Sequence, residues 1–214
     1  MRSFAHRSRQ VGLGLIELMI SMAVLALVMT GVYSGVQEYG HYTKGKRIAS
    51  SMGPYHQAAV DYVHRFRVPL TGQGGPAAGT VTGVVDAFGP TIAELRTLNI
   101  LGATYLGSVA EVAGTPTVHL TLIPTGCVGT ACDIGISVVY PAGLASPKNT
   151  HFRALDYAIS EFGAAAGYSL PDTPGTISGS NWTSPNPRGA VAGVFGTYRT
   201  FTASGLAQFL TVSD

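Results

Sequence analysis

Charged residues are scarce in this chain, and so are cysteine and tryptophan. Asp, Glu, Lys and Arg make up 11% of its 214 residues, and there are two Cys and one Trp against 28 Gly and 12 Pro. This composition favours a loop-rich, β-containing extracytoplasmic domain over a cytosolic enzyme. The length is enough for one domain with a real core in addition to a long helix.

The common motifs of catalysis and cofactor binding are also missing. The sequence contains no G-x-S-x-G, no phosphate-binding loop and no G-x-G-x-x-G. The six histidines are scattered, and His56, Asp61 and His64 lack the i, i+4 spacing of a helical metal pair. We therefore expect no enzymatic activity, no cofactor and no metal site.

Positive charge is concentrated at the N-terminus, where Arg2, Arg7 and Arg9 occur without any acid. The whole chain has a formal net charge of +2 from 13 Lys and Arg against 11 Asp and Glu. Removing residues 1–12 takes away three of these cations and no acid, which leaves 10 against 11, or −1. No basic field for nucleic acid would remain, so we expect no nucleic-acid partner.

Residues 13–36 form a long hydrophobic run with a single charge, Glu17. As a helix, 24 residues are enough to cross a bilayer core. The preceding arginines keep residues 1–12 in the cytoplasm and send the chain from residue 37 onward across the membrane. An ionised carboxylate in such a helix costs roughly 2.5–3.5 kcal/mol. This cost indicates that Glu17 has a functional role. The alternative is that its carboxylate snorkels to the lipid headgroups.

The stretch GLGLIELMISMAVLAL, residues 12–27, resembles the N-terminal signal of the type IV pilin family. In that family a prepilin peptidase cuts after a glycine on the cytoplasmic side, and the fifth residue of the mature chain is glutamate. Counting back from Glu17 places the cut between Gly12 and Leu13, whereas a cut after Gly14 would make the glutamate the third residue. The family usually begins with an N-methylated Phe or Met, from which Leu13 departs. A simple signal anchor is the alternative.

The resemblance implies a role in assembly for the new N-terminal amine at Leu13 and for the Glu17 carboxylate. Cleavage creates an amine at Leu13, and an unpaired ammonium and an unpaired carboxylate are both costly in an apolar helix bundle. Subunits staggered so that Leu13 meets Glu17 relieve both costs. The expected partners are other pilin subunits, the prepilin peptidase and the inner membrane before assembly.

The implied fold is α+β and type IV pilin-like, with a long N-terminal α-helix packed on an antiparallel β-sheet head. We expect a prepilin leader at 1–12, a long helix at 13–67 with 13–36 in the membrane or filament core, and a globular head at 68–214. Pro54 should kink that helix. Apolar and small residues three and four apart predict its buried face beyond the membrane: Tyr42, Gly45, Ala49, Met52, His56, Ala59, Val63 and Phe66.

Residues 117–123 alternate between apolar and polar side chains, and residues 134–140 are apolar and β-branched. Together they predict an antiparallel hairpin. Cys127 and Cys132 lie in its connection, with four residues between them. Outside the cytoplasm we expect them to form a disulfide; two free thiols are the alternative. A zinc site is not expected from two thiols without a nearby histidine.

The other head segments give weaker signals. A capping box at Thr91 and Glu94 predicts a helix over 91–101 that Gly102 ends, preceded by a short strand at 80–85. A second helix is expected over 151–166, with Gly167 as its stop. A loop at 170–187, with Trp182 packed beneath it, and closing strands at 190–195 and 208–212 complete the prediction.

The order of these segments resembles the constant region of shufflon-type (PilV-like) minor pilins of the type IVb group. That resemblance implies a minor or tip pilin with a periplasmic head that later joins an extracellular pilus. Members of the group carry an exchangeable C-terminal adhesin, which we expect to be missing beyond Asp214, so a cell-surface receptor stays open as a partner. A major pilin, a type II secretion pseudopilin, or a signal-anchored periplasmic enzyme or sensor are the alternatives.

Overall fold

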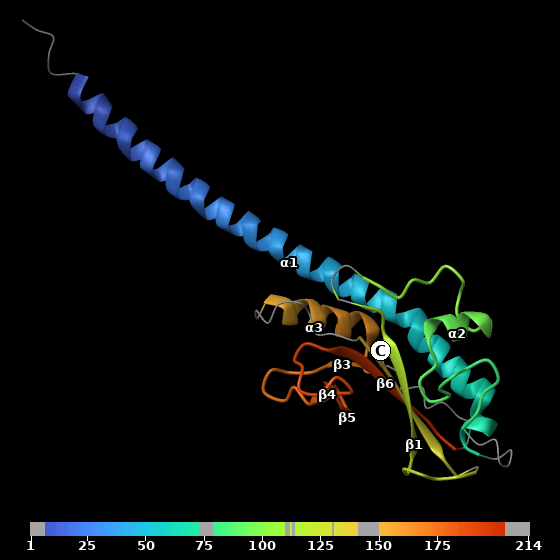
Figure 1. Ribbon diagram of the computed structural model, residues 1–214. Helices are drawn as coiled ribbons and strands as arrows, with labels where there is room; N and C mark the ends of the chain where they lie inside the picture. Colours follow the sequence, from blue (N-terminus) through green and yellow to red (C-terminus); the bar gives the residue numbers. More distant parts are fainter. Residues whose placement is uncertain are drawn as a thin grey trace, which may run out of the picture. The chain divides into compact units, whose positions relative to one another are not determined.

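The computed structural model describes residues 7–72, 79–109, 112, 114–129, 131–140 and 150–203. The chain divides into two compact units, residues 1–40 and 41–214. Helix α1 (Arg7–Leu70) belongs to the first unit by its N-terminal part and to the second by its C-terminal part (Figure 1). The second unit adds a sheet and two shorter helices, so the protein is α+β.

The long helix ends at Leu70, three residues beyond the predicted end, and its break is not where we expected it. Both Pro54 and Pro69 lie inside α1, but the dihedral angles depart from helical values at Phe66 (φ −113°, ψ 22°). The prediction of a kink at Pro54 is therefore wrong. The proline ring collides with the carbonyl of the preceding turn, and Phe66 lies in the turn just before Pro69.

The described strands form one antiparallel sheet in the order β1-β2-β6-β3-β4-β5. Among the described strands β6 is the last in the sequence, and it lies between β2 and β3, so it joins the β1–β2 hairpin to the strands β3, β4 and β5. The strands are β1 (Thr117–Ile123), β2 (Asp133–Val139), β3 (Ala166–Tyr168), β4 (Thr176–Gly179), β5 (Thr183–Pro185) and β6 (Phe195–Phe201).

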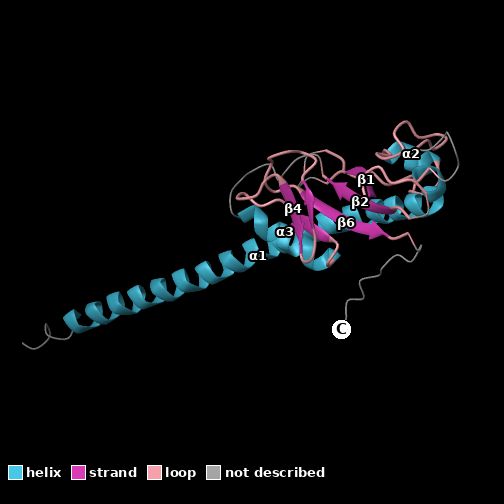
Figure 2. Cartoon of the chain, turned by 90° about the horizontal axis from the view of Figure 1, so that it is seen from below, coloured by secondary structure: helices cyan, strands magenta, loops and turns pink. Residues whose placement is uncertain are grey.

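Strand register places the apolar side chains of β1 and β2 on the same face of the sheet. Val118 pairs with Val138 and Leu120 with Ile136. All four are buried in the main core, together with α1 residues such as Met52. Figure 2 shows the sheet with α3 and the C-terminal part of α1 on one side of it. The predicted hairpin is therefore confirmed, and the apolar positions Val118 and Leu120 of its alternating first strand lie on the buried face.

Helix α2 (Ile92–Thr97) begins as predicted and ends earlier. The Thr91 hydroxyl accepts a hydrogen bond from the Glu94 N–H, and the Glu94 carboxylate accepts one from the Thr91 N–H, which is a complete capping box. The end is a Schellman motif in which Asn99 adopts φ 56° and Ile100 N–H donates to the Leu95 carbonyl at 3.0 Å. Gly102 is therefore not the stop, because asparagine tolerates the left-handed conformation three residues earlier.

Helix α3 (Thr150–Phe162) also stops before its predicted glycine. Gly163 adopts φ 86° and donates its N–H to the Ile159 carbonyl at 2.7 Å, while Gly167 lies in β3. The apolar side of α3 packs on the core through Leu155, which is fully buried, and through half-buried Phe152 and Ile159.

Three other predicted segments differ from the structure. Residues 80–85 form turns instead of a strand, and the closing strand lies at Phe195–Phe201 instead of at 190–195. The predicted loop at 170–187 contains the short strands β4 and β5. The expected strand at 208–212 lies outside the described residues.

Candidate functional site

The N-terminal part of α1 has an apolar surface that no other described part of the chain covers. Every residue from 14 to 36 is exposed, and large side chains such as Leu15 (61%) and Leu27 (74%) are among them. An apolar surface of this extent marks contact with a membrane or with other protein chains. Among the described residues, one helix, within Gly14–Leu70, is long and apolar enough to cross a membrane.

The serine and threonine hydroxyls in this apolar segment are hydrogen-bonded within the helix itself. Ser21 donates to the Glu17 carbonyl at 2.8 Å, Thr30 to the Ala26 carbonyl at 2.7 Å and Ser34 to the Gly31 carbonyl at 2.9 Å. Such bonds satisfy a hydroxyl without a solvent partner, which suits a helix in lipid or in a helix bundle. These polar residues are thus compatible with an apolar environment around the segment.

Glu17 is the one charged side chain between residues 14 and 36, and none of the described side chains donates to its carboxylate. Its side chain is exposed on α1. The helix also includes the backbone of Gly12 and Leu13, the residues of the predicted cleavage site. The structure therefore places Glu17 on the same helix as the predicted site, about one turn from Leu13.

The C-terminal part of α1 is buried along the face that the spacing predicted. Gly45, Ala49, Met52, His56, Ala59 and Val63 are buried, and Tyr42 and Phe66 are half-buried. The buried surface is wider than predicted because Ile48, Tyr55 and Tyr62 are also fully buried. This part of α1 is a core helix of the head.

Two buried tyrosines of α1 hold the irregular segment that follows the helix. Tyr55 donates its hydroxyl to the Pro90 carbonyl at 3.1 Å, and Tyr62 donates to the Ala87 carbonyl at 3.0 Å. Burial, the largest cause, raises the pKa of both hydroxyls above the ordinary value for tyrosine. They therefore stay protonated donors, and they satisfy backbone carbonyls that no helix or strand would pair.

His56 is a buried polar residue on this face. Its Nδ1 lies 2.8 Å from the Thr197 hydroxyl of β6, in hydrogen-bond contact, and its ring meets Phe162 of α3 edge-on at 5.4 Å. Burial, and to a smaller extent Arg199, lowers the pKa of His56 to about 4. A neutral imidazole therefore joins α1, α3 and the sheet.

The expected disulfide is present between Cys127 and Cys132, whose Cα atoms are 5.7 Å apart. It closes the tip of the β1–β2 hairpin. The Gly129 N–H in this loop donates to the Thr71 carbonyl at 2.7 Å, just beyond the end of α1. The disulfide loop is thus fixed to the long helix.

Neither a metal centre nor a catalytic cluster emerges from the described residues. No group of three His, Cys, Asp or Glu side chains among them could hold a metal ion. His64 packs edge-on against Phe201 at 6.0 Å, and Asp61 accepts a hydrogen bond from Gln57. His56 and His64 thus have structural contacts.

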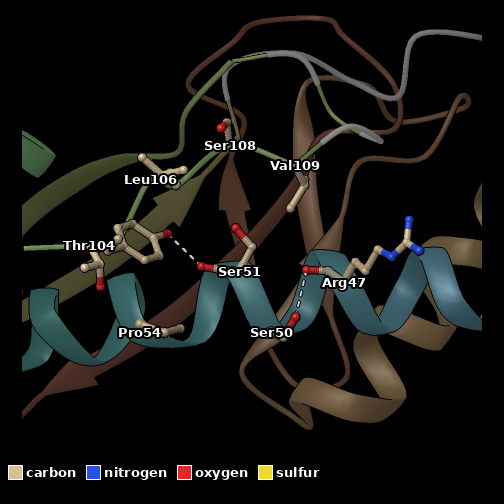
Figure 3. Close-up of a pocket in the computed structure, with 10 residues that line it drawn as sticks. Arg47, Ser50, Ser51, Pro54, Thr104, Leu106, Ser108 and Val109 are labelled. Atoms are coloured by element: carbon tan, nitrogen blue, oxygen red, sulfur yellow. Dashed lines mark hydrogen bonds between the residues drawn. The ribbon is translucent and has the colours of Figure 1, made fainter. Parts of the chain in front are cut away.

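A groove of about 480 Å³ runs between α1 and residues 104–109 (Figure 3). Ser50 donates to the Arg47 carbonyl at 3.1 Å and Tyr105 donates to the Ser51 carbonyl at 2.6 Å, so two of its hydroxyls are already used. Figure 3 shows the Arg47 side chain extending away from Ser51. The groove therefore brings no charged group together with its hydroxyls.

An exposed apolar helix with one carboxylate, followed by a head of antiparallel sheet and core helix, defines an α+β architecture consistent with the type IV pilin fold. Residues 7–33 match the family model described as the prokaryotic N-terminal methylation motif. This match supports a type IV pilin-like or pseudopilin-like assembled subunit, a structural class, and it indicates processing by a prepilin peptidase. No curated protein and no solved structure matches the chain significantly.

Proposed function

We propose that this protein is a structural subunit of a type IV pilus, cut by prepilin peptidase between Gly12 and Leu13 and assembled through its N-terminal helix. The observation that carries the proposal is the exposed apolar segment 14–36, which overlaps the matched motif at residues 7–33 and has Glu17 as its one charge. The head travels across the inner membrane on a single-pass helix and then joins an extracellular filament.

The role of Glu17 in assembly follows from the cost of isolated charges in an apolar bundle. The carboxylate receives no hydrogen bond from the described side chains of its own chain, and cleavage adds one ammonium group at Leu13. A neighbouring subunit shifted along the helix axis brings its Glu17 to that ammonium, so each contact removes two unpaired charges. The pairing also fixes the axial register of neighbouring subunits.

The substitution Glu17→Ala tests this pairing. The variant should insert and be cleaved, since both the leader and the apolar segment are intact, but its amount in sheared filaments should fall at least tenfold. Ser21→Ala is the matched control, because it removes a polar group one turn away that bonds only to its own helix. Immunoblots of membranes and sheared filaments give the measurement. Normal incorporation of Glu17→Ala would contradict the pairing.

Within this class we propose a minor or tip pilin of the type IVb group, similar to the shufflon constant region. The support is the order of the β1–β2 hairpin, α3, the loop with Trp182 and the closing strand β6. Quantitative mass spectrometry of sheared filaments tests it: a minor subunit is a small fraction, a major pilin dominates, and a pseudopilin stays off the cell surface. A signal-anchored periplasmic enzyme or sensor would retain residues 1–12.

A further inference from the structure

Among the described residues, two buried side-chain polar atoms have no hydrogen-bond partner, and both belong to arginines: Nε of Arg96 and Nε of Arg188. Proteins leave few buried N–H groups unpaired, because each costs free energy comparable to a lost hydrogen bond. Both arginines lie near the start of β1. Arg188 donates to the Thr117 hydroxyl at 3.0 Å, and Arg96 lines a cavity that Thr117 also lines.

The cavity that Arg96 lines has a volume of about 390 Å³, within the size range of small-ligand pockets. It lies between the start of α2 and the start of β1, and Arg96 is the one charged residue among those that line it. The rest of the lining is mainly apolar. The apolar walls are formed by Tyr55, Pro90, Ile92, Leu106, Pro116 and Val118.

The nearby acids of the described segments are already engaged elsewhere. Glu94 accepts hydrogen bonds from the N–H groups of Val85 and Thr91, each at 2.7 Å, and Asp86 accepts one from Phe88 N–H at 2.9 Å. Both carboxylates serve to fix backbone turns. Their hydrogen bonds come from backbone N–H groups and the Thr91 hydroxyl, so neither carboxylate occupies the guanidinium donors of Arg96 or Arg188.

We propose that this cavity binds a small carboxylate with an apolar body, a binding activity that goes beyond filament assembly. The planar guanidinium of Arg96 presents paired N–H donors that suit a carboxylate. The apolar walls hold the rest of the ligand, and Arg188 adds positive charge from behind Thr117. A bare inorganic anion would leave those walls in contact with water, so the site selects a carboxylate joined to an apolar group.

The proposal is tested by titrating the full ¹⁵N-labelled chain in detergent micelles with N-acetyl-leucine, followed by amide NMR. We expect saturable shifts at the non-proline residues of 89–93 and 115–118 with N-acetyl-leucine. N-acetyl-leucinamide, which has the same shape without the charge, and inorganic phosphate should each bind at least tenfold more weakly. Binding of the amide as strong as that of the acid would overturn the role of the guanidinium. Equal binding of phosphate would overturn the selection of an apolar body.

Substitution of Arg96 by glutamine provides the second test. Arg96→Gln should weaken N-acetyl-leucine binding at least tenfold, whereas Arg153→Gln, an exposed arginine on α3, should leave it unchanged. The comparison of acid, amide and phosphate uses the unmodified chain, so it decides the matter even if Arg96→Gln misfolds. Absence of any saturable shift with N-acetyl-leucine in the unmodified chain would overturn the proposal.

Discussion

Glu17 and His56 are both titratable residues on α1, but their surroundings give them different roles. Glu17 is exposed on an apolar surface, and His56 is buried with a hydrogen-bond partner. The sequence was sufficient to find Glu17, because its signal is local: one charge at a fixed distance from Gly12. It also placed His56 on the buried face, but not beside Thr197, which lies 141 residues further along the chain.

His56 should make the stability of the head depend on pH. Its pKa is about 4 in the folded head and about 6.5 in an unfolded chain. Between these values the unfolded chain binds more protons, so the free energy of unfolding should fall as pH is lowered from 6.5 towards 4, by up to about 3 kcal/mol. His119, whose pKa is lowered chiefly by burial, adds to the same trend. Urea denaturation followed by the fluorescence of Trp182 measures it.

Trp182 is a suitable reporter because it is the one tryptophan and belongs to the head. Its ring packs against that of Tyr198 in a tilted arrangement, with the centroids 5.3 Å apart, and it donates to the Ala164 carbonyl at 3.0 Å. In His56→Gln the loss of stability between pH 6.5 and 4 should be smaller than in the unmodified chain. An identical loss in both proteins would disprove the role of His56.

Gly45 should be sensitive to the addition of even one methyl group. A Cβ at this position would lie 2.5 Å from the Ala154 carbonyl oxygen and 2.6 Å from Tyr157 Cβ, so α1 and α3 would have to separate. We expect Gly45→Ala to lower the free energy of unfolding by about 1–3 kcal/mol. Gly40→Ala is the control, because its Cβ would meet nothing within 4 Å. If both variants unfold at the same urea concentration, the two helices do not pack this closely.

At the scale of helices and strands, the sequence predicted the structure correctly where a local pattern determines it. The bounds of β1, 117–123, were predicted as observed because Val118, Leu120 and Leu122 alternate with polar residues. The start of α2 was found because its capping box depends on two residues three apart. The predicted disulfide was found because both cysteines lie in one hairpin connection.

The errors occurred where distant contacts decide the structure. The strands β4 and β5 are four and three residues long and mostly polar, so they lack the alternating pattern and depend on pairing with β3 and with each other. The arginines Arg96 and Arg188 come together near Thr117 from α2 and from the loop before β6. No spacing in the sequence could have predicted that proximity.

The capping box of α2 should contribute measurably to the stability of the head. Thr91→Ala removes the hydroxyl that accepts from Glu94 N–H, and it should lower the free energy of unfolding by about 1 kcal/mol. Thr97→Ala removes an exposed hydroxyl that bonds only to the Ala93 carbonyl, so it should change stability by less than about 0.5 kcal/mol. The same urea denaturation applies. A Thr91→Ala variant as stable as Thr97→Ala would contradict the capping role.

At the scale of the whole molecule, the two units differ in whether their apolar side chains are exposed or buried. The apolar side chains of residues 14–36 are exposed, whereas the head buries its apolar side chains around the C-terminal part of α1 and the sheet. A protein with this division has a stable head in solution and an N-terminal helix that needs a bilayer or other helices. That requirement is the physical basis for the proposed filament subunit.

The most direct test of this account is the intact mass and N-terminal sequence of the protein purified from its native cells, with and without reductant. The account predicts a chain that begins at Leu13 and gains about two mass units on reduction, as one disulfide requires. A methyl group on the Leu13 amine would show that the chain also carries the family's N-terminal methylation. A chain that still begins at Met1 would contradict prepilin processing and leave a membrane-anchored head with another role.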